Sequence, residues 1–218
     1  MKIISVNVGL PREVTWQNKI VTTGIFKEPV AGRVIMRRLN LDGDRQADLR
    51  VHGGVDKAVY AYPSEHYEFW RKKLPGMELP WGMFGENLTT QGVIEDSVFI
   101  GDRFVVGETE VVVTQPRMPC YKLGIKFGRP EIIKEFLESR RTGFYFAVIR
   151  EGTVGPGDTM ELISREQKEI SIADVTRLYA FDKEDWKTME RAIAVQALPQ
   201  NWKRYFQQRT SLDSSPRS

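Results

Sequence analysis

Short runs of aliphatic and aromatic residues, separated by turn-forming residues, dominate the chain as far as residue 163. Runs rich in Val, Ile, Phe and Tyr that are bounded by Gly, Pro, Asn and Asp are typical of β-strands. We expect strands at residues 2–8, 16–22, 32–41, 98–100, 104–106, 110–114, 143–150 and 160–163. Because many of the connections between them are short, the pattern predicts a β-barrel or a β-sandwich.

Two segments within this region follow the helical period instead. Residues 63–73 place their aromatic residues on one side, and Ser64 is the expected N-terminal cap. Residues 131–139 form a second, shorter amphipathic segment. The histidine in the first of these helices, His66, has no partner at metal-ligand spacing, so we interpret it as an ordinary helix residue.

The pattern changes after Ser164, where three helical segments follow one another. They are predicted at residues 172–179, 183–196 and 200–208. Ser171 and Asp174 are spaced for a reciprocal cap on the first, and Asp182 is placed to cap the second. We therefore expect a β-rich body over residues 1–165 and a small three-helix domain over residues 166–218.

The composition excludes several classes of protein. The 218 residues carry a net charge of only +3, from 32 basic and 29 acidic residues, so no nucleic-acid partner is predicted. The single cysteine rules out an internal disulfide and a multi-cysteine zinc site, and it suits a reducing compartment. No apolar run approaches the roughly 20 residues that span a bilayer, and the first residues lack a signal-peptide pattern. We expect a cytoplasmic protein with no membrane partner.

The one cysteine, Cys120, stands in the segment with the densest chemistry. A strand ends just before it, and Pro116 and Pro119 restrict the backbone, so we expect the thiol on a stiff extended loop. Arg117 precedes the cysteine and Lys122 follows it. Nearby cations favour the thiolate, which is the form that attacks electrophiles or binds metals. The alternative is a small buried apolar side chain without chemistry, which is common for free cysteine.

A second dense segment, residues 45–62, surrounds the adjacent Gly53 and Gly54. Its charged side chains and its histidine are Arg45, Asp48, Arg50, His52, Asp56 and Lys57. Paired glycines permit unusual backbone angles, and exposed amides together with cations can form a seat for phosphate. The alternative is a hairpin loop with scattered surface charge.

One asparagine, Asn87, follows Gly85 and Glu86 in a loop that is rich in glycine and aromatic residues. Asparagine at such a position commonly forms a turn. Its amide can equally offer a donor and an acceptor to a heterocycle. The local sequence leaves both interpretations open.

Four blocks of the sequence resemble the MOSC family, the molybdenum-cofactor sulfurase C-terminal domain, and in particular its YiiM-like branch. The blocks are DLRVHGGVDKAVYAY (48–62), MFGENLT (83–89), GDRFVVGETEVVVTQPRMPCYKLG (101–124) and GFYFAVIREGTVGPGD (143–158). They occur in the family's order, with the single cysteine where the family has its own. The three-helix tail matches the small helical domain of this branch, so the resemblance covers nearly the whole chain.

The resemblance implies a mainly β fold, a MOSC-type β-barrel with a few peripheral helices, followed by the helical domain. It implies binding of the molybdenum cofactor, Mo-molybdopterin, with Cys120 as the thiolate ligand to molybdenum. It also implies reduction of N-hydroxylated compounds, such as hydroxylaminopurines, hydroxylamines and amidoximes, and detoxification of such base analogues. Electrons would come from a separate reductase, since no flavin, iron–sulfur or haem signature is present. A homodimer is compatible with the sequence.

The resemblance also suggests roles for particular residues. The candidates to hold the phosphate of the pterin are Arg50, Gly53, Gly54, Lys57 and Arg117. Asn87 is the candidate to meet the edges of the pterin. His52 is the candidate to relay a proton, because its unperturbed pKa lies near neutrality.

Three alternatives stay open at this point. Cys120 could carry a persulfide as a sulfur carrier, although this sequence shows no pyridoxal-phosphate domain to generate one. The chain could bind or carry the cofactor without turnover. Cys120 could also work with His52 in a hydrolase or thiol enzyme, which requires a third group that orients the pair.

Overall fold

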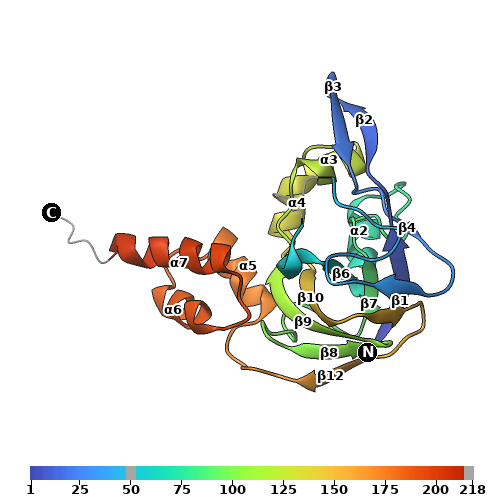
Figure 1. The fold of residues 1–218 in the computed structure, drawn as a ribbon. Helices are drawn as coiled ribbons and strands as arrows, with labels where there is room; N and C mark the ends of the chain where they lie inside the picture. Colours follow the sequence, from blue (N-terminus) through green and yellow to red (C-terminus); the bar gives the residue numbers. More distant parts are fainter. Residues whose placement is uncertain (48–52, 214–218) are drawn as a thin grey trace.

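The computed structural model describes residues 1–47 and 53–213, and its main element is an eight-stranded sheet (Figure 1). In spatial order the strands are β12 (Met160–Ser164), β8 (Arg103–Val106), β9 (Thr109–Pro116), β10 (Phe144–Arg150), β6 (Val59–Pro63), β7 (Leu88–Gln91), β1 (Lys2–Val8) and β4 (Glu28–Pro29). Neighbouring strands are antiparallel except β6 and β7, which run parallel. Two ribbons accompany the sheet: β2 (Arg12–Trp16) with β3 (Lys19–Thr23), and β5 (Val34–Met36) with β11 (Gly152–Val154).

The sheet is open over the described residues, which corrects the expected closed barrel. Its edge strands are β12 and β4, and no ladder joins them. β4 has only two residues and ends in Pro29, which has no N–H to donate. Just before β12 the chain contacts β1 through an isolated bridge between Lys2 and Thr159 and through backbone hydrogen bonds between Ile3 and residues 157 and 158, but these contacts form no ladder. With its helices included, the fold is mixed α/β rather than mainly β.

A hairpin replaces the single strand expected at residues 16–22. β2 ends at Trp16, β3 begins at Lys19, and Gln17 and Asn18 form the turn with φ of 48° and 60°. Positive φ at both central residues suits the tight turns that join antiparallel strands, and asparagine tolerates it better than most residues. The hairpin projects away from the eight-stranded sheet (Figure 1).

Other expected strands differ in length. Within residues 32–41 only β5 is a strand, and in residues 98–100 Phe99 forms just an isolated bridge to Ser171. The strands expected at 2–8, 104–106, 110–114, 143–150 and 160–163 are confirmed with small differences at their ends. They are therefore the reliable part of the sequence pattern.

In the described part of the chain, four helical segments lie between the strands. They are the 3₁₀ turn η1 (Val55–Lys57), α2 (Glu65–Lys73), α3 (Tyr121–Phe127) and α4 (Ile132–Glu138). The helices α2 and α4 confirm the two predicted ones, whereas α3 has no predicted counterpart. Ser64 does not cap α2 with its side chain: its own backbone angles are helical and its hydroxyl makes no capping bond.

Three further helices complete the described chain, as predicted: α5 (Ile172–Ala180), α6 (Trp186–Ala194) and α7 (Gln200–Asp213). Ser171 and Asp174 form the expected reciprocal cap, with Asp174 N donating to Ser171 Oγ at 3.0 Å and Ser171 N donating to Asp174 Oδ2 at 3.0 Å. The cap of α6 is Asp185 and not Asp182, which instead accepts a hydrogen bond from Arg177 at 2.6 Å. No helix in the described part of the chain is long and apolar enough to cross a membrane.

One apolar core runs from the sheet into the C-terminal helices. It joins Val113 of β9 and Phe146 of β10 to Val175 of α5 and Phe206 of α7. The C-terminal helices, which lie to one side of the sheet in Figure 1, therefore share one core with it. The boundary predicted between residues 165 and 166 stays a prediction.

A second core is aromatic. It lies on the opposite face of β6 from the first core. Tyr62 stacks on Phe84 with ring centroids 4.4 Å apart, and Trp70 stacks on Phe136 at 6.1 Å. Tyr60 belongs to the same cluster. Aromatic pairs of this kind contribute about 0.5–1.5 kcal/mol each beyond their buried area. This aromatic cluster supports the pocket that Tyr60 lines.

Candidate functional site

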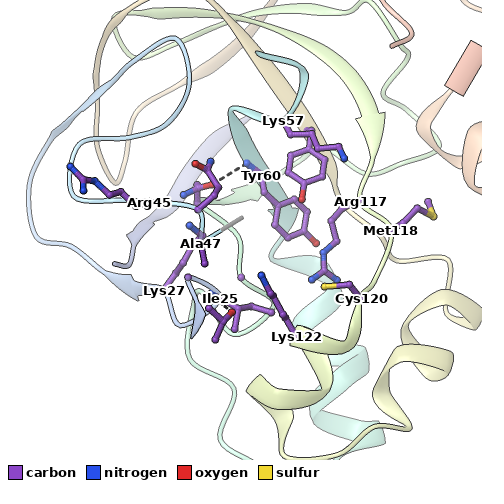
Figure 2. A pocket seen from close by; sticks show the side chains of 16 residues that line it. Ile25, Lys27, Arg45, Ala47, Lys57, Tyr60, Arg117, Met118, Cys120 and Lys122 are labelled. Atoms are coloured by element: carbon purple, nitrogen blue, oxygen red, sulfur yellow. Dashed lines mark hydrogen bonds between the residues drawn. The ribbon is translucent and has the colours of Figure 1, made fainter. Parts of the chain in front are cut away.

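A basic pocket forms where segments distant in the sequence meet (Figure 2). Its lining comes from β3 and the loop after it, residues 45–47, the end of η1 and start of β6, the loop before β7, the loop after β9, the start of α3, and β10. Its empty volume, including the part open to solvent, is about 630 Å³, which suits a small-molecule site. The cationic lining residues are Lys27, Arg45, Lys57, Arg117 and Lys122, and no acidic residue of the described chain lines it.

Cys120 contributes its free thiol to this pocket and is partly exposed. β9 ends at Pro116, residues 117–120 form an irregular loop, and α3 begins at Tyr121. The backbone of Cys120 is extended, with φ of −131° and ψ of 172°, as expected for a stiff loop next to prolines. The thiol therefore faces a polar cavity instead of being enclosed in hydrocarbon.

Arg117 is the most unusual group in the basic pocket. Its side chain is buried, with its guanidinium 5.5 Å from the Tyr60 ring centroid and 5.1 Å from that of Phe136. Its Nη1 atom is buried and has no hydrogen-bond partner among the described residues. Burial opposes its charge, yet the acidic groups of Tyr60, Tyr145 and Cys120 outweigh this effect and raise its pKa, so it stays a cation. A buried cation with an unused donor is the signature of a site that binds an anion.

Two tyrosines form the wall that holds Arg117. Tyr60 of β6 and Tyr145 of β10 are paired directly opposite each other on neighbouring strands, with ring centroids 5.3 Å apart. Burial raises the pKa of both phenols, although Arg117 opposes the shift, so both keep their protons at neutral pH. Tyr60 donates its hydroxyl to the Thr142 carbonyl at 2.8 Å. Tyr145 consequently remains a protonated hydroxyl beside the cysteine loop.

A buried polar network supports the opposite wall. Lys27 donates to Asp44, and Asp44 also accepts from Gly9 N at 3.0 Å and from Asn87 Nδ2 at 3.0 Å. Asn87 Oδ1 accepts from Tyr60 N at 3.1 Å. Burial lowers the pKa of Lys27, and Asp44 opposes the shift. This network positions the two walls relative to each other across the pocket.

The structure brings together four of the predicted site residues: Cys120, Arg117, Lys57 and Asn87. The amide of Asn87 is engaged within the protein, since its Nδ2 also donates to the Asn7 carbonyl at 3.3 Å. Its contact with a pterin stays a prediction.

The remaining predicted residues do not join this group in the described part of the chain. Gly53 and Gly54 do not line the pocket, and Gly54 precedes η1 with φ of 96°, its carbonyl accepting from Lys57 N at 3.0 Å. Arg50 and His52 lie outside the described residues. Their roles in cofactor binding and proton transfer stay predictions.

Several lining residues have no counterpart in the sequence-based site. Tyr145 lies in a predicted strand and Tyr60 lies where no strand is predicted, and only the pairing of β6 with β10 brings both to Arg117. Lys27 stands alone between two glycine- and proline-rich segments. The alternation of Tyr60 and Tyr62 is the only local signal for the first tyrosine, and Tyr145 lies between two phenylalanines without such a signal.

Comparison with known protein families shows which family the chain belongs to. The model of the MOSC domain matches residues 48–161, which contain Cys120 and most of the sheet. The protein is a member of the MOSC family. A second model, for the YiiM-like 3-alpha helix domain, matches residues 170–211, which contain α5, α6 and nearly all of α7. This MOSC protein therefore belongs to the YiiM-like group, as its sequence blocks suggest.

Three relatives illustrate this membership. YflK of Bacillus subtilis (strain 168) is 43% identical over 204 residues, covering 94% of this chain and 92% of YflK. The crystal structure of YiiM from Geobacillus stearothermophilus is 36% identical with a TM-score of 0.81, covering 96% of this chain and 98% of that one. A protein named reductase from Gibberella moniliformis (strain M3125 / FGSC 7600) is 32% identical over 161 residues, covering 72% of this chain but only 28% of the reductase. The MOSC chain thus corresponds to one part of that longer protein.

Proposed function

We propose that this MOSC protein binds molybdenum-bearing molybdopterin in the basic pocket and reduces N-hydroxylated small molecules. The observation that carries the proposal is the buried Nη1 atom of Arg117, which has no hydrogen-bond partner within residues 1–47 and 53–213 and lies in the same pocket as the free thiol of Cys120. An anionic group would satisfy the guanidinium, and a soft metal would suit the sulfur. Membership of the MOSC family and similarity to part of a named reductase support the same reading.

The residues present fit such a cofactor. Among the described residues, no group of three or more His, Cys, Asp and Glu side chains could hold a metal ion. A metal here would therefore need ligands from an organic group besides Cys120 Sγ. Arg117, Lys57 and Lys122 would hold the phosphate of that group, and Cys120 would hold the metal. The cofactor, when bound, supplies two-electron chemistry at molybdenum.

The proposed reaction converts R–NHOH, two protons and two electrons into R–NH₂ and water. The N–O bond breaks, the nitrogen is reduced, and a separate electron-donating reductase is oxidised. Cys120 fixes the site of reaction, and Arg117 keeps the phosphate in place. Tyr145 retains its proton at neutral pH, because burial raises its pKa, and supplies a hydroxyl donor that lines the pocket with Cys120. The proton relay by His52 stays a prediction.

The test is metal content and turnover together. Protein from a host with intact molybdenum-cofactor synthesis should contain about one molybdenum per chain, and protein from a host lacking that pathway should contain none. The loaded protein should convert 6-hydroxylaminopurine to adenine with an artificial electron donor. Molybdenum binding without turnover of any N-hydroxylated compound would identify a carrier and refute the enzyme. Turnover of an ester or thioester by metal-free protein would favour the thiol hydrolase instead.

Anion binding in the basic pocket should weaken at alkaline pH because of Lys57. Burial lowers the pKa of Lys57, and Asp56 opposes the shift. As the pH rises, a lysine with a lowered pKa loses its charge earlier than an ordinary lysine, whose pKa is 10.5. The affinity for an anion should therefore be greatest below the shifted pKa and fall as the pH rises through it. Binding in that range should be accompanied by proton uptake.

Calorimetry with sulfate measures this change in affinity. Sulfate stays a dianion between about pH 7 and 10, and this range lies well above the pKa values of carboxylates, so neither the ligand nor an ordinary carboxylate changes its charge. Lys57→Ala should bind sulfate about tenfold or more weakly at neutral pH, from loss of a charged hydrogen bond. Lys57→Arg keeps its charge and should lose less affinity on the alkaline side than the unmodified protein. Lys72→Ala removes an exposed lysine paired with Glu68 and serves as the control. Parallel alkaline loss in the unmodified protein and Lys57→Arg would contradict the assignment to Lys57.

A further inference from the structure

The buried carboxylate of Glu95 joins two elements of the fold outside the basic pocket. Glu95 lies in the turn after β7 and is 5% exposed. Its Oε1 atom accepts a hydrogen bond from Gly143 N at 2.6 Å, just before β10 begins. Its Oε2 atom lies 2.7 Å from Nε2 of His66, in the first turn of α2. Because an ionised carboxylate only accepts hydrogen bonds, the ring nitrogen donates, and Glu95 ties α2 to the start of β10.

His66 and Glu95 do not line the basic pocket. They line a separate cavity next to the start of α5, and in the described part of the chain the two cavities share no lining residue. The buried ring of His66 lies edge-on to Tyr62, with centroids 5.3 Å apart. The backbone carbonyl of Glu95 accepts from Ala173 N of α5 at 3.2 Å. Either side chain of the pair can therefore be replaced without changing the lining of the basic pocket.

The backbone segment that Glu95 holds also holds two residues of the basic pocket. The Thr142 carbonyl accepts the Tyr60 hydroxyl at 2.8 Å, and the Gly143 carbonyl accepts from Arg117 N at 3.4 Å. Tyr60 and Arg117 are neighbours in turn, with the guanidinium 5.5 Å from the ring centroid (Figure 2). One short segment thus sets the position of both the buried cation and the ring beside it.

Gly143 leaves this segment little freedom to move. Its φ is 62°, in the left-handed region that favours glycine. A Cβ atom at this position would lie 2.4 Å from the Ala61 carbonyl oxygen and 2.9 Å from ring carbons of Tyr60 and Tyr62. The segment and the rings are packed without spare room, so a shift of the backbone displaces the Tyr60 ring as well. Glu95 supplies the acceptor that the buried N–H of Gly143 requires.

We propose that Glu95 is a positioning residue of the basic pocket and acts through the Thr142–Gly143 backbone. It keeps the Arg117 guanidinium at the place where an anion binds, and His66 keeps the carboxylate of Glu95 in the right orientation. The inference rests on the proposed function, because it takes the anion bound at Arg117 to be the phosphate end of the cofactor. Residues that orient a binding group from outside the site typically contribute about 10–100-fold to affinity, as outer partners of metal ligands do.

Sulfate binding to full-length protein made without molybdenum tests this role in calorimetry. Glu95→Gln keeps the size of the side chain and replaces one acceptor oxygen by a donor, so sulfate should bind about tenfold more weakly. In an Arg117→Ala background the same substitution should change the remaining affinity little, because Glu95 acts through Arg117. This double-mutant cycle separates an effect through the guanidinium from general damage to the pocket.

His66 provides a test by conservative replacement. His66→Leu removes the donor to Glu95 and should weaken sulfate binding in the same direction as Glu95→Gln. His66→Gln can place its amide nitrogen near the position of Nε2, so it should restore most of the affinity. Equal sulfate affinities in the two His66 variants would contradict the orienting hydrogen bond.

The matched control is Asp102→Asn, which changes a buried carboxylate elsewhere in the sheet. Asp102 accepts from Phe99 N at 3.0 Å and from Arg165 Nε at 2.7 Å, and it does not line the basic pocket. This variant should lose stability in urea unfolding and keep its sulfate affinity. The comparison shows whether sulfate binding responds to the Glu95 contacts or to stability in general.

The outcomes separate this inference from the proposed function. Sulfate binding that depends on Arg117 but is unchanged in Glu95→Gln overturns the positioning role and leaves anion binding at Arg117 in place. An equal loss from Glu95→Gln with and without Arg117, or an equal loss in Asp102→Asn, also overturns it. Unchanged sulfate affinity in Arg117→Ala overturns both the anion site and the positioning role. Dependence on Arg117 and Glu95 in a protein that reduces no N-hydroxylated compound supports the positioning role and refutes the proposed reaction.

Discussion

Replacing Cys120 by Ala should reduce the molybdenum content to background and abolish reduction of N-hydroxylated compounds. Loss of a group that merely orients a metal ligand costs about 10–100-fold in affinity or activity, so loss of the ligand itself should cost more. Cys120→Ser tests the chemistry further, because its hydroxyl has nearly the same size and is a poor ligand for a soft metal. Both variants should fold normally, since the side chain is partly exposed at the pocket. Metal analysis and the turnover assay give the two readouts.

Because the sequence contains one cysteine, the same bond can be followed without any activity. A thiol reagent should label metal-free protein at one thiol per chain, and molybdenum-loaded protein should resist labelling until the cofactor is removed. Met118→Ala changes a neighbouring residue of the pocket and leaves the thiol, so it serves as the control for local disturbance. Full labelling of loaded protein, or full molybdenum content in Cys120→Ala, would refute Cys120 as the ligand.

Sequence reasoning located part of the site from groups of chemically active residues that lie close together along the chain. Arg117 and Cys120 share one loop, and two prolines make the stiffness of that loop readable from the sequence. Tyr60 and Tyr145 become neighbours only through the register of β10 on β6. Register depends on which face of each strand is buried across the whole sheet, and local patterns do not specify it.

The differences in the fold have similar causes. Gln17 and Asn18 form a turn without glycine, so the usual signal of a hairpin is missing and one strand is predicted in place of two. β6 and β7 are buried strands with little alternation, and no strand is predicted at either place. Closure of a sheet depends on the pairing of its two edge strands, which no stretch of sequence displays on its own.

The docking of the C-terminal helices on the sheet is likewise not predicted from local sequence patterns. The three C-terminal helices are predicted individually from their period and caps, as for α5 with Ser171 and Asp174. Their docking depends on contacts between distant residues, such as Trp202 with Gln115. Local sequence patterns therefore predict the helices but not the way in which they pack on the sheet.

Replacing Asp44 by Ala should lower the free energy of unfolding by about 3–5 kcal/mol, the usual cost of removing one partner of a buried ion pair. Asp44 is 2% exposed and Lys27 is 8% exposed, so the ammonium left behind would lose its partner and have little contact with water. Gly9 N and Asn87 Nδ2 would lose an acceptor as well. Urea unfolding followed by circular dichroism measures the change.

Asp42→Ala is the matched control, because Asp42 pairs with Arg37 at 2.7 Å where both side chains are well exposed. Such surface pairs contribute about 0–1 kcal/mol. The double variant Lys27→Met, Asp44→Ala removes the stranded charge and should recover part of the loss. Since Asn87 links Asp44 to the backbone of Tyr60, Asp44→Ala should also weaken sulfate binding in the basic pocket. Equal destabilisation by Asp42→Ala and Asp44→Ala, or no recovery in the double variant, would show that the ion pair does not support this wall.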